Sequence, residues 1–159
     1  MHAVHPNSRI ADLIGLLSVL SSTFSGRAEL YKLEKEMEVD LDDLMPIVFT
    51  ADALGFVTVG EGDITLTDKG IEFLEAKTGR RKKIIAGSLR HAEPFATVLE
   101  MGKFTVEDLA KKLEEKNVQT FISPRGNLDL EMLLVEWGVY SGLLRKEDEK
   151  YYVAQNASV

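Results

Sequence analysis

Apolar residues recur three or four positions apart through the first third of the chain, the spacing that places side chains on one face of an α-helix. Asn7 or Ser8 is the expected cap of the first helix, because short polar side chains accept hydrogen bonds from the free N–H groups at a helix start. Asp40 or Asp42 is expected to cap the third helix, and Gly55 is placed to end it. The pattern predicts three helices, at residues 10–20, 30–37 and 40–54.

The pattern then changes from helical to alternating. Residues 56–59 and 64–66 indicate two strands, and the Gly-Glu-Gly-Asp sequence at residues 60–63 supplies a turn that tolerates positive φ. Thr67 is the expected cap of a further helix, which Gly79 ends. Three helices, a β-hairpin wing and a closing helix predict a winged helix-turn-helix unit.

The second half opens with a connecting helix from Arg80, which Pro94 interrupts and residues 95–101 continue. Thr105 and Asp108 have the spacing of a capping box, in which each side chain bonds the backbone N–H of the other residue. A helix is therefore expected to begin directly after Thr105.

The last helix and hairpin complete the second half. Residues 123–126 indicate a loop, Asn127 can cap the helix that follows, and Gly142 is expected to end it. Trp137 is expected to pack in the core, and residues 143–153 indicate a second hairpin. The predicted buried side of the helix comprises Leu128, Met132, Val135 and Tyr140.

The order helix, glycine, strand, polar turn and strand at the end of the chain repeats the order at residues 54–66. This repeat indicates a structural duplication without sequence identity. We therefore predict a mainly α fold with small β-hairpins (α+β), built from tandem winged helix-turn-helix-like units. The predicted units are residues 1–79 and residues 80–159, the second of which includes a helical linker.

Composition excludes several functional classes. The chain has 159 residues, 45% of them hydrophobic, and contains no cysteine. Disulfides, thiolate catalysis and cysteine-ligated metal sites are therefore excluded. The apolar run Leu13–Leu20 is far shorter than the about 20 residues that span a bilayer, and Met1–Asn7 holds no Lys or Arg for a signal peptide. We expect a cytoplasmic protein without direct membrane insertion.

Charge argues against the usual role of a winged helix, which is to hold DNA. Residues 1–79 carry 6 Lys and Arg against 14 Asp and Glu, and residues 80–159 carry 13 against 12. The two helices that would read DNA carry no cation, whereas affinity for DNA depends on cations that neutralise phosphates. The corresponding helix of the second unit carries Asp129, Glu131 and Glu136. The acidic positions predicted to contact a protein partner are Asp42, Asp43, Asp52, Glu61 and Asp63.

Two alternatives remain open at this stage. The first is a DNA-binding transcriptional regulator that uses cations of the second half, although the basic run could equally be a solvated face paired with Glu72 and Glu75. The second is a small-molecule sensor with a pocket between the two units, lined by Phe95, Trp137 and Tyr140. The cations of the first alternative are Arg80, Arg81, Lys82, Lys83, Lys111, Lys112 and Arg125.

An enzyme is the least supported class. Acid–base catalysis needs carboxylates that converge in a pocket, and adjacent pairs on a helix surface do not indicate one. No phosphate-binding glycine loop and no nucleophile elbow occur in the sequence. His2, His5 and His91 lack the spacing of metal ligands. We expect no catalytic residue, no metal and no cofactor.

Seven short segments follow one another along the chain: His5-Pro6, Arg9-Ile10, Leu13–Leu17, Asp42–Val48, Leu54–Phe56, Gly62–Thr67 and Trp137-Gly138 with Tyr140. In this order they resemble the AAA-associated C-terminal domain, which follows the ATP-binding subunit of nitrate/sulfonate/bicarbonate-type ABC importers. The resemblance covers roughly residues 5–154.

The resemblance implies a regulatory or interaction module that accompanies an ATPase, with an ABC-type ATPase or transporter component as its partner. It implies no catalytic residue, and a transporter partner would place the protein at the membrane periphery. No nucleotide-binding Gly-x-x-x-x-Gly-Lys-Ser/Thr motif precedes His5. Either the protein acts on a separate ATPase, or the ATPase part lies outside this sequence.

Overall fold

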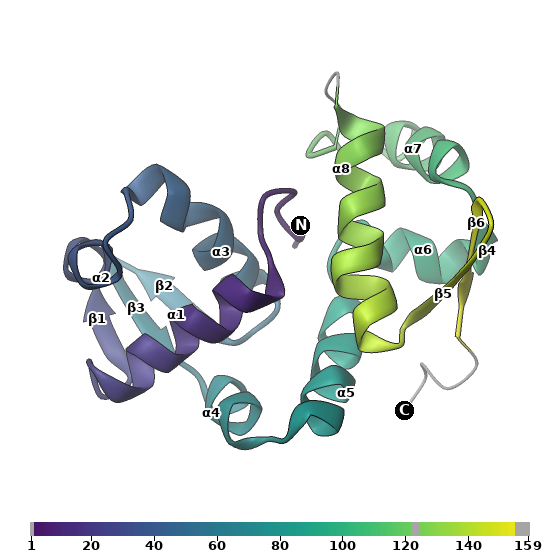
Figure 1. Ribbon diagram of the computed structural model, residues 1–159. Coiled ribbons are helices and arrows are strands. Elements are labelled where there is room, and N and C mark those ends of the chain that lie inside the picture. The colour runs from purple at the N-terminus through teal and green to yellow at the C-terminus, as the bar shows by residue number, and fades with distance from the viewer. Residues whose placement is uncertain (1, 122–124, 155–159) are drawn as a thin grey trace.

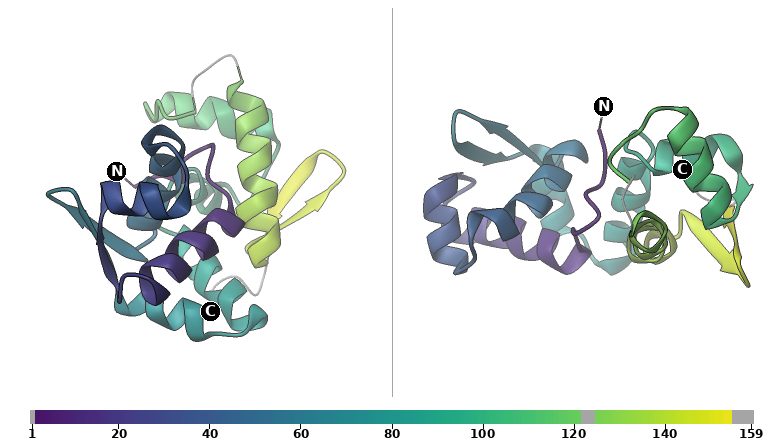
Figure 2. Two further views of the ribbon diagram at one scale, coloured as in Figure 1. Left: turned by 60° about the vertical axis from the view of Figure 1, so that its left-hand side comes forward. Right: turned by 90° about the horizontal axis from the view of Figure 1, so that it is seen from above.

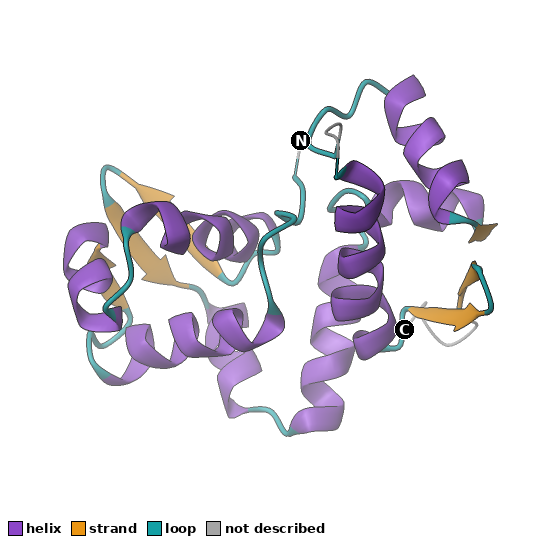
Figure 3. Cartoon of the chain, turned by 45° about the horizontal axis from the view of Figure 1, so that its top comes forward, coloured by secondary structure: helices purple, strands orange, loops and turns teal. Residues whose placement is uncertain are grey.

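Helices make up most of the fold, and two small antiparallel sheets lie toward opposite sides of the molecule (Figures 1 and 3). The structure is a computed structural model that describes residues 2–121 and 125–154. The first half comprises α1 (Ile10–Ser22), β1 (Arg27–Glu29), α2 (Leu30–Met37), α3 (Leu41–Ala53), β2 (Val57–Gly60), β3 (Asp63–Leu66) and α4 (Asp68–Glu75). The second half comprises α5 (Thr78–Leu89), α6 (Phe95–Met101), β4 (Lys103–Phe104), α7 (Val106–Glu115), α8 (Gly126–Leu133), the π-helix η1 (Leu134–Val139), β5 (Leu144–Glu147) and β6 (Lys150–Val153).

The two halves repeat one arrangement of strands. In each sheet the third strand pairs with both others, which gives the orders β1-β3-β2 and β4-β6-β5. Before the first strand of each sheet stands a glycine with positive φ, and its carbonyl accepts a hydrogen bond from the end of the third strand. Gly26 accepts from Leu66 N–H at 2.7 Å, and Gly102 accepts from Val153 N–H at 2.8 Å. The structural duplication therefore extends beyond the hairpins.

Two further pairs of positions match between the halves. Gly55 (φ 86°) follows α3, and Gly142 (φ 84°) takes the same place after η1. In the hairpin turns, Glu61 (φ 53°) corresponds to Asp148 (φ 57°). The left-handed backbone ends a helix or tightens a turn at each of these places. The predicted fold class, mainly α with small β-hairpins, is confirmed, whereas the winged helix-turn-helix designation stays a prediction.

Several helix ends differ from the expectation. The helix capped by Thr67 ends at Glu75, and Gly79 lies inside the first turn of α5, which crosses the predicted boundary between the units. The Asp40 side chain makes no capping bond; instead the Glu34 carboxylate accepts the Leu41 N–H. The short strands β1 and β4 were not predicted, because two or three residues are too few to show an alternating pattern.

The face of the last helix was predicted wrongly. Leu128, Met132 and Val135 are 51%, 39% and 45% exposed, and Tyr140 is 37% exposed. This helix is apolar on two sides, so that spacing alone does not choose between them. The side with the larger residues is the buried one, and Trp137 on it is fully buried, as predicted. The large apolar side chains of α8 and η1 that are buried are Leu130, Leu133, Leu134 and Trp137.

Candidate functional site

The segment of residues 2–9, here named the strap, runs between the two halves of the molecule (Figures 1 and 2). On the side of the second half, Val4 N–H donates to the Glu93 carbonyl and Glu93 N–H donates to the His2 carbonyl, both at 2.8 Å. On the side of the first half, His5 N–H donates to Thr50 Oγ1 at 2.8 Å. The strap therefore binds both halves through its own backbone.

Ser8 is the point at which both halves meet the strap. The Trp137 Nε1–H donates to the Ser8 carbonyl at 3.2 Å, and the Thr50 hydroxyl donates to Ser8 Oγ at 3.0 Å. Thr50 and Trp137 each stand five residues before the matched glycines Gly55 and Gly142. Thr50 of α3 and Trp137 of η1 thus occupy corresponding positions in the two halves, and both bind Ser8.

Glu136 caps a helix of the opposite half. Its Oε2 accepts a hydrogen bond from Ile10 N–H at 2.8 Å, at the start of α1. A carboxylate in this position satisfies a free N–H and is favoured by the positive end of the helix dipole. The predicted caps were wrong: the Ser8 hydroxyl donates to the His5 carbonyl at 2.7 Å instead, and Asn7 lies two residues before the N-cap position, Arg9.

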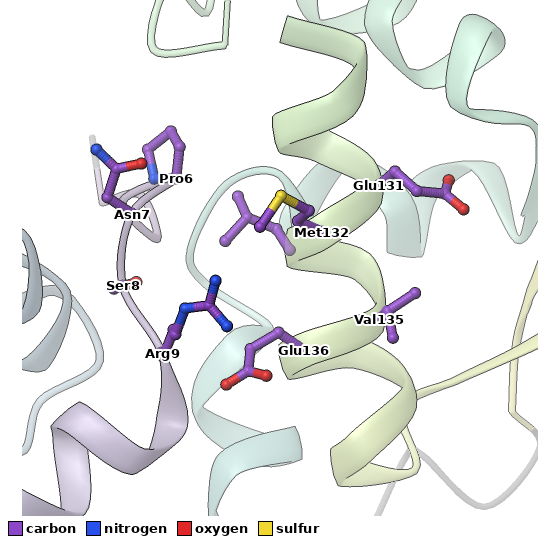
Figure 4. Close-up of a pocket in the computed structure, with 9 residues that line it drawn as sticks. Pro6, Asn7, Ser8, Arg9, Glu131, Met132, Val135 and Glu136 are labelled. Carbon is purple, nitrogen blue, oxygen red and sulfur yellow. The ribbon is translucent and has the colours of Figure 1, made fainter. Parts of the chain in front are cut away.

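A pocket of about 410 Å³ lies between the strap and the helix formed by α8 and η1 (Figure 4). In Figure 4 the Arg9 side chain extends from the strap toward this helix, and the Glu136 carboxylate extends toward the strap. A pocket between the halves was one of the expectations, but its predicted lining was wrong. Phe95 and Trp137 are fully buried, and Tyr140 instead packs against Lys82. The pocket is lined by Pro6, Asn7, Ser8, Arg9, Glu131, Met132, Leu133, Val135 and Glu136.

The acidic side of the pocket is partly neutralised. Lys146 Nζ donates to Glu131 Oε1 at 2.7 Å from the neighbouring strand β5. Burial is the largest single influence and would raise the pKa of Glu131, but the hydrogen bond and charge of Lys146, together with the Tyr151 side chain, lower it. Glu131 is therefore ionised and paired at neutral pH, which leaves Glu136 as the pocket carboxylate without a cationic partner in the described part of the chain.

Part of the pocket wall belongs to a π-helix. Leu134–Val139 forms η1, which continues α8 and carries both Val135 and Glu136 into the pocket lining. A π-helix is rare and is found preferentially at functional sites, since the extra residue in its turn redirects neighbouring side chains. Nothing in the sequence indicated the π-helix. Because this segment is apolar on two faces, the extra residue in the π-helical turn does not disturb a recognisable spacing of apolar residues.

His5 of the strap lies beside α3 of the first half. Its ring lies against Phe49 of α3, with centroids 6.4 Å apart in an edge-on arrangement. Its Nδ1 accepts a hydrogen bond from Asn7 N–H at 3.0 Å, which requires an unprotonated nitrogen. Burial lowers the pKa of His5 below its ordinary value of 6.5, and the nearby Asp129 carboxylate partly opposes this shift.

The protein is expected to lose stability on acidification through His5. Because the folded state favours neutral His5, its contribution to stability is present above the pKa of the unfolded chain and is lost as the pH falls through the lower folded pKa. Urea unfolding of the parent and of His5→Gln at about pH 7 and about pH 5 tests this. The parent is expected to lose more free energy of unfolding than the variant, and equal losses in the two proteins would contradict the assignment to His5.

The predicted acidic positions lie on the surface of the first half. Asp42 and Asp43 are exposed in the first turn of α3, and Asp52 is exposed near its end. Glu61 is exposed in the hairpin turn, and Asp63 is half-buried and accepts a hydrogen bond from Arg27 at 2.7 Å. Phe49, half exposed at 50%, lies on the same helix among these carboxylates, and sequence reasoning had not singled it out.

The basic run is used largely within the fold. Arg80 forms an ion pair with Glu72 at 2.7 Å, one of the pairings expected for a solvated face. Arg81 donates to the Phe73 and Leu74 carbonyls at the end of α4, at 3.0 and 2.9 Å, and lies over the Phe73 ring. Lys82 Nζ lies 5.0 Å from the Tyr140 ring centroid. Within the described residues, Lys83 is exposed and takes part in none of these contacts.

The remaining cations lie apart from this run. Lys111 and Lys112 are exposed on α7, at the end of the second half away from the start of α5 (Figures 1 and 2). Arg125 is exposed directly before α8. The loop expected at residues 123–126 lies partly outside the described residues. The structure therefore does not bring the cations of the DNA-binding alternative into one group.

A model of the C-terminal AAA-associated domain matches residues 31–147. The chain belongs to this family. No curated protein and no solved structure matches the chain significantly. The matched residues include α3, α8 and η1, whereas the strap and α1 lie before the first matched residue. No helix in the described part of this AAA-associated domain is long and apolar enough to cross a membrane.

Proposed function

We propose that this protein is a non-enzymatic interaction module that binds the ATP-binding subunit, or another component, of an ABC-type importer through the exposed face of α3. Membership of the AAA-associated family supports an ATPase as the partner. The observation that carries the proposal is the composition of this face. Half-exposed Phe49 stands on it among exposed carboxylates, and α3 contains no Lys or Arg.

The exposed face of α3 has the chemistry of a protein interface. Asp42, Met45, Phe49 and Asp52 follow one another at spacings of three or four residues, so that they share one side of the helix. Exposed aromatic residues within a polar rim are typical anchors of protein interfaces. The complementary partner surface is an apolar depression bordered by Lys or Arg.

The same face disfavours the other classes of function. Carboxylates repel the phosphates of nucleic acid, whose binding depends on cations. Asp42 and Asp43 are exposed on the surface of a helix, and acid–base catalysis would need carboxylates that converge on a substrate. Binding to an importer would place the protein at the cytoplasmic side of the membrane without insertion.

Binding to purified ATP-binding subunits of the importers of the source organism tests the proposal. We expect saturable binding to one of them, weakened at least about tenfold by Phe49→Ala, as for an anchor residue. Ile71→Ala is the matched control, because Ile71 is an apolar residue on α4 with a similar exposure of 44%. Absence of binding to every ATP-binding subunit would refute the ATPase as the partner, and equal effects of the two variants would refute the role of the α3 face.

Duplex DNA serves as the competing ligand in the same measurements. Fluorescence anisotropy with random and genomic duplexes at low salt is expected to show no binding. Binding that weakens steeply with added salt, with no binding to any ATPase subunit, would instead establish the DNA-binding alternative.

A further inference from the structure

The pocket between the strap and α8–η1 presents opposite charges that do not meet. Figure 4 shows the Arg9 side chain extending from the strap toward α8–η1 and the Glu136 carboxylate extending from η1 toward the strap. In the described part of the chain, no ion pair within 4.0 Å includes either residue. Two facing charges at a separation beyond direct contact leave space for a ligand that carries the complementary pair.

Each charge is available to such a ligand. Arg9 is exposed, and its five N–H donors in a planar fork match the two oxygens of a carboxylate. Glu136 uses Oε2 to accept the Ile10 N–H, which leaves Oε1 for another donor. Because that backbone bond fixes the Glu136 side chain, the acceptor is already oriented before a ligand arrives.

Apolar side chains form part of the remaining pocket wall, beside Asn7, Ser8 and the paired Glu131. Met132 and Val135 are 39% and 45% exposed, and together with Leu133 and Pro6 they contribute the apolar part of its lining. Covering such side chains gives about 25 cal/mol of stabilisation per Å² of apolar surface removed from water. The volume of about 410 Å³ lies within the range of small-molecule sites.

We propose that this pocket binds a small zwitterion with an apolar body, the chemistry shared by an apolar amino acid and a short apolar peptide. Its carboxylate binds the Arg9 guanidinium, its ammonium binds Glu136 Oε1, and its apolar body covers Met132 and Val135. The site goes beyond the proposed docking function, because it lies between the two halves and uses none of the α3 carboxylates.

The protein contains its own reporter for this site. Trp137 is the only tryptophan in the sequence, and it follows Glu136 directly. Its indole N–H donates to the carbonyl of the pocket residue Ser8. A ligand that draws Arg9 and Glu136 together shifts Ser8 and Glu136, and the Trp137 emission changes with it.

Titration with four probes tests the chemistry of the ligand, with Trp137 emission and isothermal calorimetry as the two readouts. Leucine and leucyl-leucine carry both charges and distinguish the two sources of the zwitterion. Leucinamide lacks the carboxylate, and 4-methylpentanoate lacks the ammonium. We expect saturable binding of leucine, leucyl-leucine or both, and at least about tenfold weaker binding of the two singly charged analogues.

Three variants assign the binding to the pocket. Arg9→Gln and Glu136→Gln are each expected to weaken binding about tenfold, and the amide oxygen of the second can still accept the Ile10 N–H. Arg27→Gln is the matched control, since Arg27 is an exposed arginine of β1 paired with Asp63. Thermal unfolding of all three variants confirms that they are folded.

The outcomes decide the proposal without reference to the docking function. No response to any probe up to about 10 mM, or equal binding of the singly charged analogues, overturns it. Equal affinities of Arg9→Gln and Arg27→Gln also overturn it. Because Arg9→Gln leaves α3 unchanged and Phe49→Ala leaves the pocket charges unchanged, failure of one proposal does not imply failure of the other.

Discussion

Replacing Trp137 with alanine is expected to lower the free energy of unfolding by about 3–5 kcal/mol, the range for large aromatic residues deleted from a core. Trp137 is fully buried in the helix that faces the strap. Its removal leaves a cavity and also deprives the Ser8 carbonyl of its donor. Urea unfolding followed by circular dichroism measures the loss, since the variant retains no tryptophan fluorescence.

Trp137→Phe separates packing from hydrogen bonding. Phenylalanine fills most of the same space but offers no N–H to Ser8. A loss of about 1–2 kcal/mol is expected for this variant, the usual cost of an unsatisfied buried acceptor. If the phenylalanine and alanine variants lost equal amounts, the hydrogen bond to the strap, and not the packing of the ring, would dominate.

Gly70→Ala is expected to cost about 3 kcal/mol, at the upper end of the range for an overpacked site. A Cβ at Gly70 would stand 2.5 Å from the Phe56 carbonyl oxygen and 2.6 Å from Leu66 Cδ1. The leucine side chain can rotate away, whereas the Phe56 carbonyl belongs to the backbone and accepts the Thr67 N–H at 3.1 Å. The start of α4 must therefore move away from the hairpin, and the thermal midpoint falls accordingly.

Gly15→Ala is the matched control with the opposite expected sign. Gly15 lies inside α1, and a Cβ there would meet no atom within 4 Å. Alanine restricts the unfolded chain and favours the helix, so that a gain of about 0.5–1 kcal/mol is expected. A loss at Gly15 would contradict the gain expected from helix propensity. No loss at Gly70 would show that the close approach to the Phe56 carbonyl does not decide the effect there.

Local signals in the sequence predicted the ends of several elements correctly. Thr67 caps α4 by accepting the Gly70 N–H, and Thr105 with Asp108 forms the full capping box at α7. Gly55 and Gly142 both take positive φ after their helices. Each of these interactions joins residues at most a few positions apart, and such interactions are encoded by neighbouring residue types.

The features that form the candidate site depend on distant parts of the chain. Glu136 caps α1 across 126 positions, and no pattern near Ile10 indicates a cap from elsewhere. The exposed side of α8 was misjudged because both sides are apolar, and only the packing of Trp137 against the strap and core decides between them. The acidic residues of the helix surfaces could be read from the sequence. A pocket between the two halves was also predicted, but its lining residues were predicted wrongly.

The strap also bears on the order in which the chain can assemble. The Ser8–Trp137 bond of the strap and the adjoining Ile10–Glu136 bond close loops of 129 and 126 positions. Loops of this length carry an entropy cost that hairpins and neighbouring helices avoid, so that distant contacts form late. During synthesis the strap leaves the ribosome before every other element of this fold, yet its binding site on η1 is made more than 120 positions later. The strap is therefore made before its binding site and reaches its final position only after that site exists.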